Sequence, residues 1–289
     1  MSDAKNDPLS PMTVSEQNPP FGQSGQPAWD FEHLPNVGLT LSLTAEQTPN
    51  RIAVAAPKSG QPARCSESRA LEYDRITFAE LDAASNQVAI GIQKMGVPPG
   101  TRLALMVPPG IEFVKMVFGL FKAGVTVILI DPGMGRKNMI GCLAEAKPDG
   151  IVGIKRAHLA RWLFRSKFPG CKKNVVVGRW PGCVSSRSFG QLDPSHFKAR
   201  EDGSQEDEAA IIFTTGSTGP PKGVLYRHRN FIQQAAQIRD YFIIQPGSTD
   251  VSGFPLFALF NTAMGTTTVF PQMDATRPAE VYPLSLIHI

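Results

Sequence analysis

Helical and strand-like segments alternate through the middle of the sequence, and this alternation is the feature that most limits the fold. Val125–Ile130 is a continuous, largely β-branched run, which is typical of a strand buried on both faces of a sheet. Just before it, Ile111–Lys122 has the period of a helix with a wide apolar face. Helices and strands in this order and at this spacing predict a parallel sheet with helices on both sides.

The same alternation extends in both directions along the chain. A helical period opens near Ile76 and ends before Gly96, which has the character of a C-cap glycine. The other predicted segments are a strand at Arg102–Val107, helices at Lys137–Ala146 and His158–Lys167, strands at Ile151–Ile154, Asn174–Val177 and Ala209–Phe213, and a polar loop from Arg187 to Asp207. We therefore expect an α/β domain built on an incomplete doubly wound sheet.

Composition separates the N-terminus from the rest. Residues 1–35 are rich in Pro, Gly, Ser, Gln and Asn, so we expect a flexible extension there and a domain over 36–283. Hydrophobic residues make up 42% of the chain and charged residues 19%, which suffices for a buried core. The formal net charge of +4 does not by itself indicate a nucleic-acid partner, and we expect none.

The cysteines and the N-terminus bear on the compartment. Cys65, Cys142, Cys171 and Cys183 form no C-x-x-C pair and have no histidine at zinc-like spacing, so we expect reduced thiols and no metal site. The first residues lack the apolar region of a secretory signal, and the longest apolar run is far shorter than the roughly 20 residues of a membrane helix. We expect a cytoplasmic protein, with peripheral membrane contact left open.

The segment Thr214–Gly223 carries most of the functional information. It reads Thr-Thr-Gly-Ser-Thr-Gly-Pro-Pro-Lys-Gly and follows a predicted buried strand. Glycines let a backbone approach a phosphate, successive N–H groups form an anion-binding concavity, and hydroxyls and a lysine add donors. A polar turn without a ligand is the alternative reading, and the density of donors favours a phosphate site.

A Walker loop is excluded on three counts. The pattern needs a glycine where Pro221 stands, a Ser or Thr where Gly223 stands, and a helix directly afterwards. The sequence instead continues into Val224-Leu225-Tyr226, which is strand-like, and the next helix is expected only at about Arg229. The loop is therefore predicted to connect two strands.

The same segment, with the Val224 that follows it, resembles the phosphate-binding signature of the adenylate-forming enzymes, among them acyl-CoA synthetases, fatty-acyl-AMP ligases and peptide-synthetase adenylation domains. Ile76–Leu81, Phe121–Gly124 with Ile130–Pro132, and His228-x-Asn230 resemble flanking blocks of this superfamily. The resemblance covers about residues 41 to 283. It implies the adenylate-forming fold, ATP with Mg²⁺ as cofactors, and ligase activity.

One branch fits best. Asp131–Gly135, Tyr226–His228, Phe254–Phe260 and Met273–Pro278 are similar to the olefin β-lactone synthetases of long-chain hydrocarbon biosynthesis. That branch implies adenylation of a 2-alkyl-3-hydroxy fatty acid and intramolecular β-lactone formation with release of AMP, and olefin-pathway partner enzymes. Ala258 stands where acyl-CoA synthetases usually have histidine. A fatty acyl-CoA synthetase, a fatty-acyl-AMP ligase and a non-catalytic nucleotide- or acyl-binding module remain as alternatives.

The resemblance also implies which residues bind ligands. The residues expected at the nucleotide are Thr214, Thr215, Gly216, Ser217, Thr218, Gly219 and Lys222. Their hydroxyls would donate to the β- and γ-phosphates, the glycines would let the loop close, and the lysine would contact phosphate or anchor the loop. The residues expected near the acid substrate are Phe257, Ala258, Phe260 and His228. Core packing is an equal alternative for Phe257 and Phe260, and capping of the next helix for His228. No residue is assigned a catalytic role.

The stretch from Lys155 to Arg179 is basic and contains no acidic residue. A solvated helix face with its loop is the plain interpretation. The alternative is a docking surface for an anionic membrane or an acidic partner enzyme. The sequence leaves both open.

Later blocks of the superfamily are absent from the sequence. No Tyr-Gly-x-Thr-Glu block follows the phosphate loop, and the ribose-binding aspartate and the C-terminal domain with its lysine are missing too. Leu284–Ile289 matches the translation of a transposon-end adapter used in sequencing libraries, which predicts a non-native tail. We therefore expect an N-terminal fragment of an adenylate-forming ligase that is inactive by itself.

Overall fold

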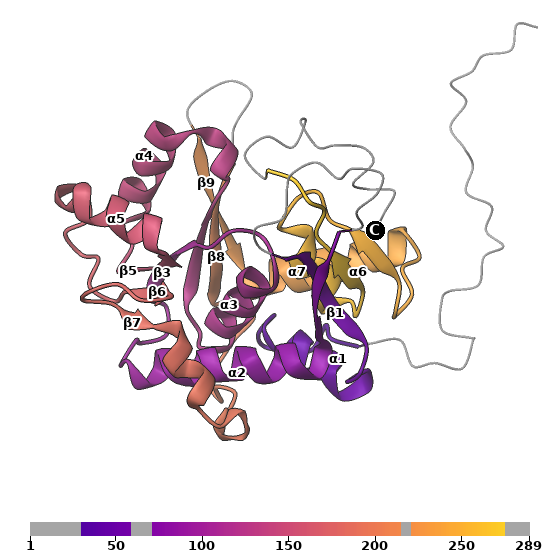
Figure 1. Ribbon diagram of the computed structural model, residues 1–289. Helices are drawn as coiled ribbons and strands as arrows, with labels where there is room; N and C mark the ends of the chain where they lie inside the picture. The colour runs from indigo at the N-terminus through magenta and orange to yellow at the C-terminus, as the bar shows by residue number, and fades with distance from the viewer. Residues whose placement is uncertain (1–29, 59–70, 215–220, 275–289) are drawn as a thin grey trace, which may run out of the picture. The chain divides into compact units, whose positions relative to one another are not determined.

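The computed structural model describes residues 30–58, 71–214 and 221–274, and from Phe31 onward these belong to one unit with two β-sheets (Figure 1). The larger sheet has seven strands. In spatial order they are β7 (Val184–Ser185), β6 (Val175–Val177), β5 (Gly150–Ile154), β3 (Arg102–Met106), β4 (Thr126–Ile130), β8 (Glu208–Thr214) and β9 (Lys222–Arg227). The central strands are buried, as their apolar runs predict.

Six of these strands are parallel, and the order of connection places helices on both faces. The chain runs from β3 to its neighbour β4, then returns past β3 to β5 and continues to β6. Right-handed crossovers in opposite directions put α3 (Ile111–Lys122) on one face and α4 (Arg136–Ala146) and α5 (Lys155–Leu163) on the other, as Figure 1 shows. The predicted doubly wound α/β sheet is confirmed.

One edge of the large sheet is antiparallel. Strand β9 pairs antiparallel with β8, with Thr214 opposite Lys222 and Ile212 opposite Val224. The connection between the two strands is too short for a crossover, so only a hairpin can join them. The prediction that the phosphate loop connects two strands is confirmed.

A second, four-stranded sheet was not predicted. Its strands, in spatial order, are β10 (Thr249–Val251), β11 (Thr267–Val269), β1 (Ile52–Pro57) and β2 (Tyr73–Thr77). Strand β1 pairs parallel with β11 although more than 200 residues separate them in the chain. No local pattern in either strand specifies this pairing.

Of the seven α-helices in the described residues, five lie close to their predicted positions, and the first and the last were not predicted. The seven helices are α1 (Leu39–Gln47), α2 (Phe78–Lys94), α3 (Ile111–Lys122), α4 (Arg136–Ala146), α5 (Lys155–Leu163), α6 (His228–Tyr241) and α7 (Phe257–Ala263). Short 3₁₀ turns are η1 (Pro132–Met134), η2 (Arg165–Lys167), η3 (Ser186–Gln191) and η4 (Pro194–His196). A capping box starts α2, because Thr77 accepts from Glu80 N and Glu80 accepts from Thr77 N. Gly96, with φ +63°, ends it.

The structure differs from the prediction in two segments, the N-terminal extension and the loop from Arg187 to Asp207. The flexible extension was expected to reach residue 35, but Phe31 is already buried, beneath the Arg239 guanidinium at 5.1 Å. Gln205 also donates to the carbonyls of Glu32 and Leu34 at 2.7 and 2.9 Å. The predicted loop from Arg187 contains η3 and η4, and Phe189 of η3 is buried against Gly91 of α2.

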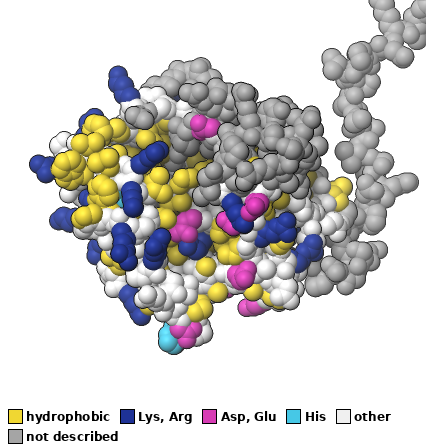
Figure 2. All heavy atoms as spheres, in the orientation of Figure 1, with side chains coloured by type: hydrophobic (Ala, Val, Ile, Leu, Met, Phe, Trp, Pro, Cys, Tyr) yellow, Lys and Arg dark blue, Asp and Glu magenta, His cyan; other side chains and the backbone are white. Residues whose placement is uncertain are grey.

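The surface over α4 and α5 carries clustered hydrophobic side chains with Lys and Arg around them (Figure 2).

Within the described ranges, no helix is both long and apolar enough to cross a membrane. Cys142, Cys171 and Cys183 are free thiols, as expected, and Cys65 lies outside the described residues.

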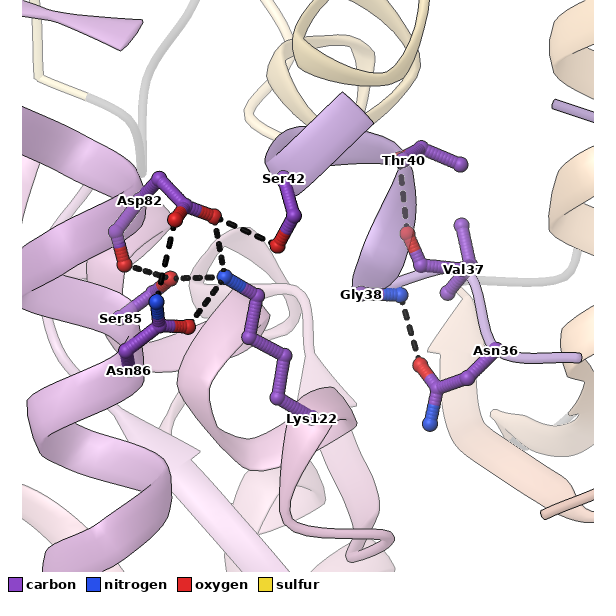
Figure 3. A network of polar contacts seen from close by, with 9 residues as sticks. All are labelled: Asn36, Val37, Gly38, Thr40, Ser42, Asp82, Ser85, Asn86 and Lys122. Carbon is purple, nitrogen blue, oxygen red and sulfur yellow. Dashed lines mark hydrogen bonds and ion pairs between the residues drawn. The ribbon is translucent and has the colours of Figure 1, made fainter. Parts of the chain in front are cut away.

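A buried lysine joins the first three helices. Lys122, at the end of α3, has a fully buried side chain, and its Nζ donates to Asp82 Oδ1 at 2.5 Å, Ser85 Oγ at 2.8 Å and Asn86 Oδ1 at 2.7 Å, all on α2 (Figure 3). Ser42 of α1 donates to the same carboxylate oxygen at 2.7 Å. A lysine ammonium has three donors, so every one of its protons has a partner here.

Candidate functional site

The hairpin formed by β8 and β9 places the predicted phosphate loop at the carboxyl edge of the large sheet. Strand β4 lies parallel to β8 with Ile130 beside Phe213, so the segment Asp131–Gly135 emerges next to Thr214. Asp131 accepts from Gly133 N at 2.8 Å and so caps η1. Ligands of open α/β sheets bind outside the carboxyl ends of the strands, which makes this edge the candidate site.

The structure describes only part of the predicted nucleotide-binding set. Thr214 is the last residue of β8, and its backbone pairs with Lys222 at the start of β9. Lys222 is exposed. The others, Thr215, Gly216, Ser217, Thr218 and Gly219, lie outside the described residues. The two strands therefore fix both ends of the loop.

Gly223 has a steric role that the sequence did not reveal. A Cβ built on it would lie 2.9 Å from Cζ of Phe213 and 3.2 Å from Cγ2 of Ile211. Phe213 is buried in the core between the sheet and α4. Glycine at this position therefore lets β9 pair closely over a bulky core ring just after the loop.

Alternate residues of β9 face an apolar groove. Side chains along a strand point alternately to opposite faces, so Lys222, Val224 and Tyr226 share one face. Val224 and Tyr226 line the groove, and Ile212 of β8, which is paired with Val224, lines it too. Lys222 thus lies on the groove's face of the strand, one step nearer to the phosphate loop.

The groove has a volume of about 930 Å³ and is open to solvent on one side. Its walls come from the hairpin, α6, the segment before α7, and α7 itself. The lining residues are Ile212, Val224, Tyr226, Phe231, Gln234, Gln237, Ile238, Asp240, Tyr241, Phe242, Phe254, Leu256, Phe257 and Phe260. Its size and its largely apolar lining with a few polar groups are those of small-molecule sites.

Aromatic contacts hold the floor of the groove together. The Phe231 ring centroid is 5.1 Å from that of Tyr226 and 5.9 Å from that of Phe260, which links the hairpin through α6 to α7. Asn261 anchors α7 from behind, because its Nδ2 donates to Asp250 Oδ2 at 2.7 Å and to Ser252 Oγ at 3.0 Å. These contacts join the hairpin, α6 and α7 beneath the groove and tie α7 to β10.

The predicted acid-binding residues divide into two groups. Phe257 and Phe260 both line the groove, and Phe257 is 51% exposed, so core packing does not explain its position. Ala258 is fully buried in the first turn of α7 and does not line the groove. Whether any of the three contacts a substrate remains a prediction.

His228 lies away from the groove lining. It is buried, its Nδ1 accepts from Val37 N at 3.4 Å, and its ring meets the ring of Phe121 edge-on at 5.9 Å. Burial lowers its pKa to about 4, with Asp207 opposing and Arg200 adding to this shift. The capping role expected for it belongs to Arg227, whose N–H donates to Asn230 Oδ1. His228 is a neutral side chain that connects α6 to the segment before α1.

Sequence reasoning missed the α6 wall of the groove. Phe231, Gln234, Ile238 and Tyr241 recur at helical spacing along one stripe of α6, and all four line the groove. The period was available in the sequence and predicted an amphipathic helix. Which apolar surface that helix meets depends on α7 and the hairpin, and no local signal gives that.

The end of α6 is strained at the margin of the groove. Ile243 has φ +56°, a left-handed conformation that β-branched residues rarely adopt, and Ile244 N–H then bonds to Arg239 O at 2.9 Å. We expect Ile243→Gly to raise the free energy of unfolding by about 1 kcal/mol, because glycine adopts this conformation without a steric cost. Chemical denaturation measures the change. The neighbouring variant Ile244→Gly should destabilise, and equal effects at the two positions would contradict the prediction.

The described residues offer no evident metal centre. They contain no group of three or more His, Cys, Asp or Glu side chains placed to hold a metal ion. Magnesium in nucleotide sites is bound largely through substrate phosphates and water, with one or two carboxylates. We therefore assign no protein ligand to Mg²⁺.

Known proteins are similar to this chain in sequence and in fold. Residues 41–281 match the model of the AMP-binding enzyme family. The olefin beta-lactone synthetase of Xanthomonas campestris pv. campestris is 40% identical over 257 residues, which are 88% of this chain and 45% of the relative. The olefin beta-lactone synthetase of Stenotrophomonas maltophilia is 39% identical over 258 residues, which are 87% of this chain and 45% of the relative. The chain thus spans less than half the length of these relatives.

A solved structure extends the likeness to the fold. The long-chain-fatty-acid-CoA ligase of Archaeoglobus fulgidus superposes with a TM-score of 0.68, covering 81% of this chain and 46% of that chain. The two sequences are 20% identical, so this match bears on the fold alone. It confirms the α/β architecture predicted from the alternation of helices and strands.

Proposed function

The chain belongs to the AMP-binding enzyme family, and we propose that it carries the phosphate loop and acid groove of a ligase that adenylates a 2-alkyl-3-hydroxy fatty acid. The observation that supports this most is the placement of Lys222. It starts the strand whose next residues on the same face, Val224 and Tyr226, line an apolar groove of about 930 Å³. An alkyl chain in that groove would bring its carboxylate toward the phosphate loop.

The proposed reaction has two steps. The substrate carboxylate attacks the α-phosphate of ATP, which forms an acyl-adenylate and releases pyrophosphate. The 3-hydroxyl of the same molecule then attacks the acyl carbon, loses its proton and expels AMP, which leaves a four-membered β-lactone. Because nucleophile and electrophile belong to one molecule, the second step needs positioning and no external thiol.

The loop would act on the first step. Donors directed at the β- and γ-phosphates stabilise the charge that grows on the leaving pyrophosphate. We assign this role to the hydroxyls of Thr214, Thr215, Ser217 and Thr218 and to Lys222. Gly216 and Gly219 would allow the backbone to close on the phosphates. Mg²⁺ would arrive with ATP and neutralise part of its charge.

The groove would act on the substrate. Its apolar lining favours a long alkyl chain over a short polar acid, since each buried methylene contributes about 0.8 kcal/mol. Phe257 and Phe260 on α7 would contact this chain. Gln234, Gln237 and Asp240 are the polar residues of the lining, and they offer hydrogen bonds to a hydroxyl.

A second candidate is a fatty acyl-CoA synthetase or a fatty-acyl-AMP ligase. Both share the first step, and the groove suits their substrates equally. Ala258 favours the lactone branch by resemblance, since it stands where acyl-CoA synthetases usually have histidine. Ala258 itself is fully buried and does not line the groove.

The test joins this chain to the part of the Xanthomonas campestris relative that lies beyond the matched region. Acid-dependent exchange of pyrophosphate with ATP would support adenylation, and mass spectrometry identifies the product. A β-lactone formed without coenzyme A supports the proposal, and a thioester formed only with coenzyme A supports the second candidate. ATP binding without exchange of pyrophosphate would favour a non-catalytic binding module.

We expect Lys222→Ala in this fusion to slow adenylate formation about ten- to a hundredfold, because a charge-assisted hydrogen bond to phosphate contributes roughly 1.5–3 kcal/mol. Thr215→Ala with Ser217→Ala should act in the same direction. Lys222→Arg should recover part of the rate, and Lys198→Ala, which removes an exposed cation elsewhere, should change nothing. Unchanged pyrophosphate exchange in both loop variants would rule out the phosphate role.

A further inference from the structure

Helix α5 exposes a cluster of large hydrophobic side chains. The exposed fractions are 43% for Leu159, 58% for Trp162, 60% for Leu163 and 39% for Phe164. The first three recur at helical spacing, so they form one continuous face of the helix, and Phe164 extends it at the C-terminal end. We call these four residues the α5 surface.

This exposed face is not the one that packs on the sheet. Ala157 and His158 are buried, and His158 Nε2 lies 2.9 Å from Val175 O of β6. A helix on the surface of a domain ordinarily presents polar residues on its outer face. Here the outer face is apolar, and monomeric proteins seldom expose adjoining large hydrophobic residues without a partner.

Cations surround the α5 surface. From residue 150 to residue 192 the chain has nine Lys and Arg and no Asp or Glu. Lys155 and Arg156 lie at the N-terminal end of α5, and Arg165 and Lys167 follow its C-terminal end, all exposed. Within the part of the chain that the structure describes, none of these four forms an ion pair with a carboxylate. Figure 2 shows hydrophobic and basic side chains close together on this side of the molecule.

We propose that the α5 surface docks on an anionic lipid bilayer, with Trp162 and Leu163 inserted at the level of the headgroups and the four cations on lipid phosphates. Helices that lie in the interface plane combine Trp, Leu and Phe on one face with Lys and Arg around it. The long side chains of Lys and Arg can reach headgroups while their stems cover apolar surface. This inference is independent of the proposed reaction.

The chemistry favours lipid over an acidic protein. Protein interfaces are depleted in lysine and bury their aromatic residues in shaped pockets. The α5 surface instead has protruding apolar side chains at its centre and unpaired cations at both ends. A bilayer accepts that arrangement without a complementary shape, since its headgroup region is charged outside and apolar beneath.

The test is a sedimentation assay of the chain with vesicles of phosphatidylglycerol and phosphatidylcholine as the probe. We expect binding to the mixed vesicles, little binding to pure phosphatidylcholine, and loss of binding when salt rises from about 0.1 M to about 1 M, which shortens the screening length from about 10 Å to about 3 Å. Trp162 fluorescence should shift to the blue and be quenched by lipids labelled in the upper acyl chain. Trp162→Phe should bind while losing that signal.

Variants separate the two parts of the surface. Arg165→Gln with Lys167→Gln should weaken binding about 25-fold, because each cation near an anionic membrane contributes about fivefold. Trp162→Ala with Leu163→Ala should weaken it about tenfold or more. Lys94→Gln with Lys198→Gln, which removes two exposed cations outside this surface, is the matched control and should bind as the parent does. All of these residues are exposed, so thermal melting should be unchanged.

Four results would overturn the proposal. Equal binding to both kinds of vesicle, or binding that neither variant weakens, would mean that the surface is not what meets the lipid. Retention by soluble polyglutamate that only the charge variant abolishes would assign the cations to an acidic protein. A concentration-dependent dimer that Trp162→Ala with Leu163→Ala dissolves would assign the apolar face to a second copy of this chain.

Discussion

Lys122→Met should lower the free energy of unfolding by about 3 kcal/mol. Methionine fills a similar volume but leaves Asp82, Ser85 and Asn86 without the donor that they share. Removing one partner of a buried ion pair costs about 3–5 kcal/mol, and Asp82 remains 18% exposed to solvent, which keeps the loss near the lower end. Urea denaturation followed by circular dichroism measures the difference.

The same helix offers a matched control. Lys115 forms an ion pair with Glu112 on α3, and both side chains are partly exposed, 22% and 34%. Exposed pairs contribute at most about 1 kcal/mol, so Lys115→Met should change stability little. A loss below about 1 kcal/mol for Lys122→Met would show that α2 and α3 do not depend on the lysine. Replacing Asp82 as well, by leucine, should restore part of the stability, because the unpaired carboxylate is then gone.

Lys122 keeps its charge at neutral pH although burial opposes it. Burial lowers the pKa of Lys122 to about 8, and the attraction of Asp82 opposes this shift without cancelling it. The lysine is therefore still charged at pH 7. A depressed lysine pKa means that the unfolded chain holds the proton more tightly, so deprotonation between about pH 8 and 10.5 favours the folded state.

Acid should destabilise the protein through His228. Its pKa in the folded chain is about 4, against 6.5 for the unfolded reference, so only the unfolded chain takes up this proton between those values. Stability contributed by the neutral imidazole is complete above pH 6.5 and falls as the pH drops to 4. A difference of this size corresponds to about 3 kcal/mol. Denaturation curves at a series of pH values give the slope.

Two variants identify the source of that slope. His228→Gln cannot titrate, so its stability should depend less on pH between 6.5 and 4, whatever its absolute stability. The exposed His196, changed to glutamine, should leave the slope unchanged. A residual slope in His228→Gln is expected from His158, whose pKa burial also lowers. An unchanged slope in His228→Gln would contradict the role of His228.

Lys122 and His228 both stabilise one junction, at which the segment before α1 (residues 36–38) packs against the C-terminal end of α3 and the start of α6. His228 accepts from Val37 N, and Asn36 Nδ2 donates to Phe121 O at 2.7 Å, next to Lys122. A Cβ on Gly38 would lie 2.9 Å from Lys122 N, so the segment before α1 is tightly packed against α3. Because His228 opens α6, whose later turns form a wall of the groove, loss of this junction is expected to disturb the groove as well.

The local sequence predicted the bounds of an element well where all of the signal lies within that one segment. The bounds of α3 match their prediction at both ends, because its apolar face has a clear 3.6-residue period. Thr77 with Glu80 and then Gly96 mark the two ends of α2 by hydrogen bonding and by a positive φ. The phosphate loop was placed between two strands because its glycines and hydroxyls follow a buried strand and precede another.

Other features could not be predicted, because they depend on contacts between segments that are distant in the sequence. Strand β1 has no local sign of its partner β11, and the basic stretch after Lys155 gave no sign that Trp162 and Leu163 would face outward. Lys122 looked like a residue of a family signature, and only the packing of α1, α2 and α3 revealed its three hydrogen bonds.

By itself, the sequence determined the α/β class, the order of helices and strands from α2 to β9 apart from β7, the position of the predicted phosphate loop between two strands, and the family resemblance. Those features depend on periodicity, capping and turn chemistry within short windows. The tertiary structure alone decided the groove, the burial of His228 and the exposure of the α5 surface. Periodicity states which face of an element is apolar, but not which distant face it contacts, and burial, pKa and the shape of a site all follow from that contact.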